Sequence, residues 1–190
     1  SSFQLMDMKH SAHVAVITNL APNHLDMHKD MDEYVNAKKN IYLHQNGFSR
    51  TVLNLDNELT AACAEETRGR TLMFSRREKT NGAWCSENDE IFFGDTFILR
   101  EEEILLPGKH NVENYLAAIS AVWGDVSAET IVHVARTFGG VEHRMELVRE
   151  LDGVRWYNDS IATSPSRAII GTLSLYNEKI VMIAGGADKN

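Results

Sequence analysis

Short apolar runs rich in β-branched residues alternate with segments of helical periodicity in the first third of the chain. The runs His13–Thr18 and Thr51–Leu55 are typical of buried strands. Residues 30–45 carry apolar side chains at helical spacing, and residues 58–67 form a second helical segment. This β-α-β-α alternation predicts an α/β fold with a mainly parallel sheet and flanking helices.

The pattern changes twice further along the chain. Residues 71–106 contain several short strand-like runs without helices, which predicts a meander or hairpins at the sheet edge. Two helices are expected next, over 111–123 and 128–138, and then a glycine pair, Gly139-Gly140. A new strand, helix and strand are expected over 154–158, 165–176 and 180–184. We therefore predict two domains, 1–140 and 141–190, the second being the start of a Rossmann-like domain.

The composition of the chain argues against several classes of function. The 190 residues include 19 Lys and Arg against 27 Asp and Glu, a net charge of −8, which argues against nucleic-acid binding because that needs a basic face. The apolar runs are too short to cross a membrane, and two cysteines are too few for a disulfide scaffold or a zinc site. The chain starts without methionine and stops just after a strand-like run. We expect a cytoplasmic protein, and this sequence to be a piece of it.

Lys38 is the most informative single residue. It shares the apolar face of the first helix with Val35, Ile41 and Tyr42, whereas Lys39 is expected on the polar side. A lysine on such a face must be paired, modified or able to extend its ammonium to solvent, because an unpaired buried charge is costly. Spacing alone does not choose between these three interpretations.

The loop after the first strand carries a second group of candidates. His24, Asp26 and His28 lie within five residues, directly after the carboxyl end of a strand, where ligands bind in open α/β sheets. Two imidazoles and a carboxylate can hold a divalent cation. The alternative is a solvated polar loop. The metal interpretation gains support because Lys38 follows on the next helix and is placed to face the same crevice.

Three polar motifs lie further along. Asn111 and Asn114 are three residues apart in a first helical turn, so their amides are placed to bind a base edge, although Asn111 is equally suited to cap the helix. Arg144 follows the glycine pair and suits a phosphate or an interdomain ion pair. Asp159 ends a predicted strand, again at the functional edge of a sheet.

The order of these motifs resembles the Mur ligase family. The motifs are SSFQL, N-x3-[DN]-H-L-D-x-H, Y-x3-K, L-N-x-D, G-x-H-N-x2-N, H-R-x-E, N-D-S-x-A-T and GG-x-D-K, and together they extend over essentially the whole chain. The resemblance implies an ATP-dependent, amide-bond-forming ligase of peptidoglycan precursor synthesis, and therefore a role in cell-wall biogenesis, cell shape and division. The SSFQL start is most similar to the D-glutamate-adding branch, which implies UDP-N-acetylmuramoyl-L-alanine and D-glutamate as substrates.

The resemblance also implies residue roles. His24 matches the family's magnesium-binding histidine, and Lys38 matches a lysine that is carbamylated to give an anionic oxygen ligand. Asn111, Asn114, Arg144 and Asp159 match ATP-binding positions. Thr163 and Lys189 match positions around the incoming D-glutamate. Oligomeric state is not implied.

Departures and alternatives accompany the resemblance. The family's P-loop, its N-terminal domain and a magnesium-binding glutamate expected two residues before Ser1 are not in this sequence, so we expect the chain alone to be inactive. Ile161 stands where many relatives have lysine, and Asn23 replaces a frequent aspartate. The alternatives are a sibling such as folylpolyglutamate synthase, a metal-dependent hydrolase using His24, Asp26 and His28, and a nucleotide-binding module without chemistry.

Overall fold

The structure, a computed structural model, describes residues 2–21, 28–162, 173 and 176–185. It divides into two compact units. The first comprises residues 1–105 and 109–137, and the second comprises residues 106–108 and 138–190. Each unit is described by itself.

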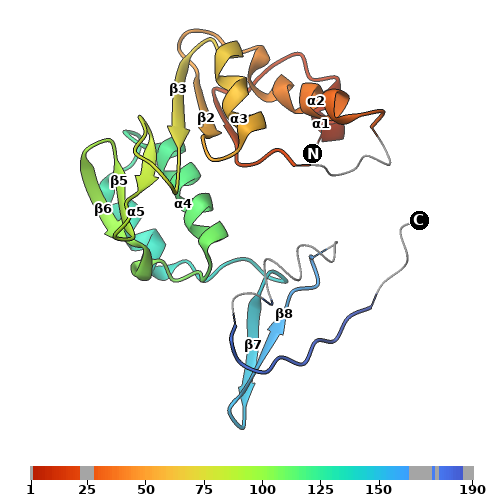
Figure 1. Cartoon of the computed structure of the whole chain (residues 1–190), viewed down its shortest axis with the longest axis vertical. Coiled ribbons are helices and arrows are strands. Elements are labelled where there is room, and N and C mark those ends of the chain that lie inside the picture. Colours follow the sequence, from red (N-terminus) through yellow and green to blue (C-terminus); the bar gives the residue numbers. More distant parts are fainter. Residues whose placement is uncertain (1, 22–27, 163–172, 174–175, 186–190) are drawn as a thin grey trace. The chain divides into compact units, whose positions relative to one another are not determined.

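A three-stranded parallel sheet organises the first unit (Figure 1). Its strands are β1 (Val14–Ile17), β2 (Arg50–Asn54) and β3 (Arg70–Phe74), side by side in that order. Val14 lies opposite Arg50, which lies opposite Arg70, so the three strands start and end at nearly the same level. Their carboxyl ends therefore share one edge. The predicted α/β class with a mainly parallel sheet is confirmed.

The described part of the first unit contains five α-helices, of which the second, third and fourth contact this sheet. They are α1 (Ser2–Met6), α2 (Met31–Leu43), α3 (Glu58–Ala62), which continues as a 3-10 turn, η1 (Cys63–Glu66), then α4 (Lys109–Val122) and α5 (Ala128–Thr137). Helix α2 begins after Asp30, whose carboxylate accepts the backbone N–H of Glu33 at 2.9 Å and so satisfies one open donor of the first turn.

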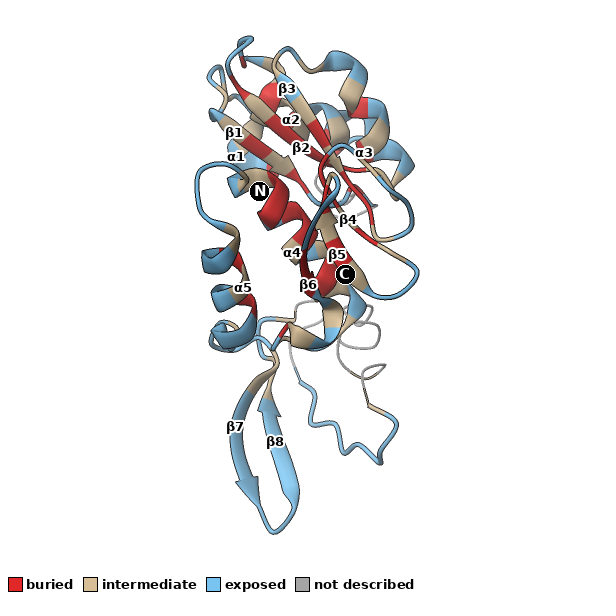
Figure 2. Ribbon diagram, turned by 90° about the vertical axis from the view of Figure 1, so that its left-hand side faces the viewer, coloured by how far each residue is buried: buried red, intermediate tan, exposed pale blue. Residues whose placement is uncertain are grey.

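The buried residues, red in Figure 2, lie mainly on the strands and on the helix faces that meet them. Ala15, Ile17 and Leu53 form one cluster with Tyr34 and Tyr42 of α2. Helix α4 packs against all three parallel strands and contributes four buried apolar residues, Val112, Leu116, Ala117 and Ile119. The main stabilising contribution of such contacts is the removal of apolar surface from water, which gains about 25 cal/mol of free energy per Å² buried.

Side-chain hydrogen bonds join the carboxyl ends of the strands. Asn54, at the end of β2, donates from its amide to the carbonyl of Thr18 at 2.9 Å. Asp56 accepts from the hydroxyl of Ser75 at 2.6 Å and from the backbone N–H of Arg76 at 2.7 Å. These contacts link β1 to β2 and β2 to β3 at the edge where the predicted loop motifs leave the sheet.

The predicted meander is confirmed as a separate antiparallel sheet of β4 (Ala83–Cys85), β5 (Glu90–Phe93) and β6 (Thr96–Arg100). The first strand-like run of that region, β3, belongs instead to the parallel sheet. The rings of Trp84 and Phe92 stack at 4.9 Å between neighbouring strands of the meander.

In the second unit, β7 (Glu146–Leu151) and β8 (Val154–Asn158) form an antiparallel hairpin. Its turn, Asp152-Gly153, has positive φ angles of 52° and 76°, as two-residue hairpin turns require. The predicted strand over residues 154–158 is confirmed, whereas β7 was not predicted.

The predicted strand Ile180–Ala184 is wrong, because residues 179–185 belong to no strand and leave Val181 and Ile183 more than four-fifths exposed. A strand needs a hydrogen-bonded neighbour, and within the described residues this segment has none. The predicted helix 165–176 falls almost entirely outside the described residues. Neither unit, so far as it is described, contains a helix long and apolar enough to span a membrane.

Candidate active site

Several predicted site residues lie outside the described residues. His24 and Asp26 belong to the segment 22–27, and Thr163 and Lys189 also fall outside the described part of the chain. The expected approach of His24 to Lys38 therefore stays a prediction. The loop that carries His24 leaves the carboxyl end of β1, as predicted.

Lys38 lies in the third turn of α2 and is half-buried. Its Nζ lies 5.1 Å from the centre of the Tyr34 ring, one helical turn earlier, in a cation–π contact. Among the described residues no carboxylate pairs with this ammonium, in contrast to Lys39, Lys79 and Lys109. Within the described part of the chain, Lys38 is thus a partly enclosed amine without a carboxylate partner.

Lys39, which was expected on the polar side of the helix, is paired with a carboxylate. Its ammonium pairs with Glu66 of η1, and its side chain is only 18% exposed. The reason is that α3 and η1 pack beside α2, which spacing within one helix does not indicate. The two adjacent lysines therefore have different surroundings, one paired with a carboxylate and the other lying over an aromatic ring.

His28 is buried rather than open to a metal. Its Nε2 lies 2.9 Å from the hydroxyl of Ser2, and its Nδ1 lies 3.6 Å from Glu33 Oε2. The ring stacks on Phe3 at 5.2 Å and meets Tyr34 edge-on at 5.5 Å. Both ring nitrogens face protein groups, so the hydrolase alternative loses one of its three proposed metal ligands.

Asn111 and Asn114 both lie in the first turns of α4. The helix begins at Lys109, so Asn111 is not its N-cap residue, and this alternative is wrong. The amide of Asn114 donates to the side-chain oxygen of Asn111 at 3.4 Å, while Val112 and Leu116 are buried on another face. The two amides therefore form one polar surface at the positive end of the helix dipole.

Arg144 and Asp159 are brought together within the second unit. Arg144 is exposed and lies between His143 and Met145, both with positive φ angles, 66° and 48°. Asp159 accepts the backbone N–H of Met145 at 3.2 Å, and the amide of Asn158 lies 2.8 Å from Nδ1 of His143. The strained turn that presents Arg144 is thus fixed by the N-D-S segment.

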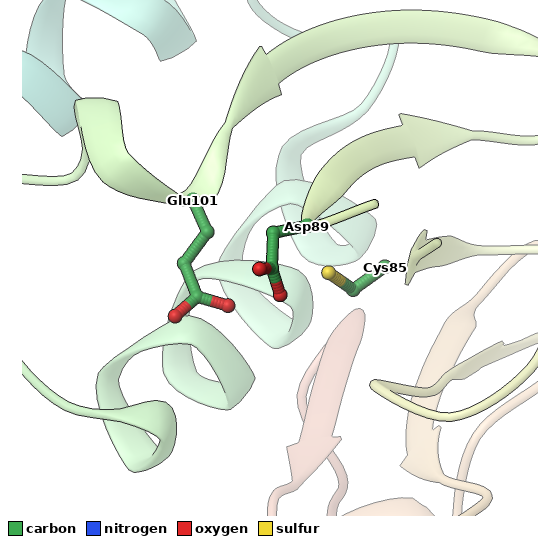
Figure 3. Close-up of side chains that lie close together, drawn as sticks. All are labelled: Cys85, Asp89 and Glu101. Carbon is green, nitrogen blue, oxygen red and sulfur yellow. The ribbon is translucent and has the colours of Figure 1, made fainter. Parts of the chain in front are cut away.

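A further cluster combines Cys85, Asp89 and Glu101, whose ligand atoms lie within 4.8 Å of one another (Figure 3). Lys109 already provides a cation there, with its Nζ 3.2 Å from Asp89 Oδ1 and 2.8 Å from Glu101 Oε2. Burial, followed by the charges of Glu101 and Asp89, raises the pKa of the Cys85 thiol to about 11. A neutral thiol beside an internal ion pair is not a metal site.

Ser2, Glu33 and Tyr34 are the contact residues that sequence reasoning did not assign to the site. Tyr34 had an available signal, since it lies four residues before Lys38 and hence on the same helix face. The contact between Ser2 and His28 joins positions 26 residues apart, and no local pattern indicates it.

This chain is similar to known proteins in both sequence and fold. Residues 2–122 match a family model described as the Mur ligase middle domain. The chain is 52% identical to UDP-N-acetylmuramoylalanine--D-glutamate ligase of Clostridium beijerinckii and 50% identical to the protein of that name from Acetivibrio thermocellus. These alignments cover 100% of this chain and 41% of each relative, so the chain spans about two fifths of their length.

Solved structures show the same fold at lower identity. MurF from Acinetobacter baumannii has a TM-score of 0.69 at 21% identity, covering 90% of this chain and 41% of that one. A pseudomurein peptide ligase type C from Methanothermus fervidus has a TM-score of 0.60 at 20% identity, covering 78% of this chain and 38% of that one.

Proposed function

Because the chain belongs to the Mur ligase family through its middle domain, we propose that the longer protein containing it is an ATP-dependent ligase that joins D-glutamate to UDP-N-acetylmuramoyl-L-alanine. The observation that carries this proposal is identity of about one half, over the whole of this chain, to relatives named for that reaction. The place of action is then the cytoplasm, in the synthesis of peptidoglycan precursors.

Lys38 is the residue through which we expect magnesium to be held. An ammonium cannot ligate Mg²⁺, which prefers oxygen ligands. The neutral amine of Lys38 can add to CO2, giving a carbamate and releasing one proton, and the carbamate oxygens suit the metal. Lys38 is half-buried and has no carboxylate partner among the residues that the structure describes, which supports this role, and His24 is the proposed second ligand. When bound, Mg²⁺ supplies charge neutralisation at phosphate oxygens.

The described polar residues are suited to ATP. Asn111 and Asn114 offer both donors and acceptors from one helical turn, which fits the edge of a base. Arg144 has a planar guanidinium that binds phosphate in bidentate geometry, and the turn around it is fixed by Asp159. We assign Thr163 and Lys189 to the D-glutamate side of the reaction on resemblance alone.

The test of this proposal compares two adjacent lysines in the full-length protein. Lys38→Ala should lower kcat by at least about a hundredfold, the scale of losing one charge-stabilising group in an active site. Lys39→Ala is the matched control, since it removes the neighbouring ammonium, which is paired with Glu66, and should change kcat less than about threefold. Added short carboxylates such as acetate should partly restore Lys38→Ala by supplying an oxygen ligand.

The measurement is phosphate release that depends on both UDP-N-acetylmuramoyl-L-alanine and D-glutamate. Equal turnover for Lys38→Ala and Lys39→Ala would show that Lys38 is not part of the active site. If the wild-type protein releases no phosphate that depends on both substrates, the proposed activity itself is wrong.

A further inference from the structure

A continuous row of side chains leads from α1 to Lys38. The ring of Phe3 stacks on the ring of His28 with centroids 5.2 Å apart and an interplanar angle of 11°. His28 meets Tyr34 edge-to-face at 5.5 Å and 70°, and the Nζ of Lys38 lies over the Tyr34 ring at 5.1 Å. His28 is the member that joins the first helix to the second.

The His28 ring is hydrogen-bonded at one nitrogen, Nε2, whereas the buried Nδ1 has no hydrogen-bond partner among the described residues. Ser2 Oγ lies 2.9 Å from Nε2, and the Glu33 carboxylate lies 3.6 Å from Nδ1. Glu33 Oε2 is itself held, since it accepts the backbone N–H of Lys29 at 2.7 Å. The His28 side chain is fully buried, so its ring has little room to rotate.

A serine, a histidine and a carboxylate in this order also occur in hydrolases that use serine as a nucleophile. Ser2 is only 3% exposed, however, and a substrate carbonyl has no access to a hydroxyl in that position. The array therefore fixes the imidazole rather than activating the serine. What the fixed imidazole contacts next is Tyr34, and through it Lys38.

We propose that His28 is a positioning residue for Lys38, acting through the ring of Tyr34. This inference rests on the proposed function, in which the Lys38 amine must be carbamylated and directed at magnesium. A lysine side chain loses conformational entropy when it is held in one place, so restricting it in advance lowers the cost of binding the metal. The aromatic row holds Tyr34, and the Tyr34 ring restricts the Lys38 side chain that lies over it before the metal binds.

The test uses the full-length protein and two readouts besides turnover. One is the ¹³C resonance of the Lys38 carbamate after addition of ¹³C-bicarbonate, and the other is the affinity for Mn²⁺ alone, followed by electron paramagnetic resonance. His28→Ala removes the support for Tyr34, so it should lose most of the carbamate signal and bind Mn²⁺ about tenfold more weakly. His44→Ala, the same change at the exposed end of α2, should match wild type.

Two further variants separate positioning from folding. The double variant Ser2→Ala, His28→Phe keeps an aromatic ring in the row and removes both partners of the hydrogen bond, so it should retain the carbamate signal and bind Mn²⁺ within about threefold of wild type. Tyr34→Leu interrupts the row while leaving Ser2 and His28 intact, and should behave like His28→Ala. If His28→Ala fails to fold, these two variants decide the question.

The outcomes distinguish this inference from the function on which it rests. Unchanged carbamate signal and Mn²⁺ affinity in His28→Ala or in Tyr34→Leu would overturn the positioning role, even if the wild type joins D-glutamate. If the double variant loses as much carbamate signal and Mn²⁺ affinity as Tyr34→Leu, the positioning role is also overturned. A carbamate that depends on His28 in a protein that forms no amide product would overturn the proposed function alone. A wild type without carbamate would overturn the positioning role and the carbamylation of Lys38, whereas the ligase activity is decided separately by formation of the amide product.

Discussion

The carboxylate of Asp159 accepts a hydrogen bond from the backbone N–H of Met145 at 3.2 Å, and so fixes the turn that presents Arg144. Met145 and His143 both have positive φ angles, which side chains other than glycine rarely adopt. A charged acceptor aimed at this turn offsets part of the strain. Asp159 therefore holds the turn next to Arg144; Arg144 is exposed, whereas Asp159 is half-buried.

Asp159→Asn should weaken this contact, because an amide oxygen is a poorer acceptor than a carboxylate. In the full-length protein we expect KM for ATP to rise about five- to tenfold, corresponding to about 1–1.4 kcal/mol of lost binding. Asp152→Asn is the matched control, since it makes the same exchange at the far end of the same hairpin and should leave KM unchanged. Equal KM values for both variants would show that Asp159 does not act on the nucleotide.

Asp56 provides a test of the sheet edge. Removing its carboxylate in Asp56→Ala leaves the buried Ser75 hydroxyl and the Arg76 backbone N–H without their acceptor. Each unsatisfied buried donor costs roughly 1–3 kcal/mol, so we expect the free energy of unfolding to fall by about 2–4 kcal/mol.

The measurement is urea unfolding followed by circular dichroism. Asp95→Ala is the comparison, since Asp95 pairs with Lys79 at the surface with a side chain that is 90% exposed, and its loss should leave the unfolding midpoint unchanged. Similar destabilisation by the two variants would contradict a special role for Asp56 at this edge.

The buried thiol of Cys85 should make the free energy of unfolding depend on pH in the alkaline range. Its folded-state pKa of about 11 lies above the ordinary value of 9.0, so between these values the unfolded thiol loses its proton while the folded thiol keeps it. The contribution of this thiol to the free energy of unfolding is fully present below pH 9 and is lost as the pH rises towards 11. The loss is on the order of 2 kcal/mol at 1.36 kcal/mol per pKa unit.

Lys109 acts in the same direction at higher pH, since hydrogen bonding to Glu101 raises its pKa above 10.5. Unfolding free energies measured from pH 8 to 10.5 should decline for the wild type and decline much less for Cys85→Ala. Parallel curves for the two proteins would show that the thiol does not titrate as its buried position requires.

Local pattern predicted the elements of the first unit well. The β-branched runs and the helical periodicity correctly indicated β1, α2, β2, the region of α3, and α4 and α5, because each element buries one face against its neighbours. The position of Lys38 on the apolar face also followed from spacing alone.

Contacts between elements distant in sequence could not be predicted in this way. Lys39 was expected in solvent because nothing in α2 indicates that Glu66 packs beside it. His28 was interpreted as a possible metal ligand because Ser2 lies 26 residues away. The strand over 180–184 was predicted from composition, although a strand also needs a neighbour to pair with. The predicted meeting of His24 with Lys38 and the predicted domain assignment of residues 141–190 stay predictions.

The central claim is that these residues serve a ligase specific for D-glutamate. The most direct measurement incubates the full-length protein with ATP, Mg²⁺, UDP-N-acetylmuramoyl-L-alanine and either D-glutamate or L-glutamate, and determines the product by mass spectrometry alongside ADP. The account predicts one amide product per ADP with D-glutamate and essentially none with L-glutamate. ADP formation without an amide product, or equal use of the two enantiomers, would contradict it.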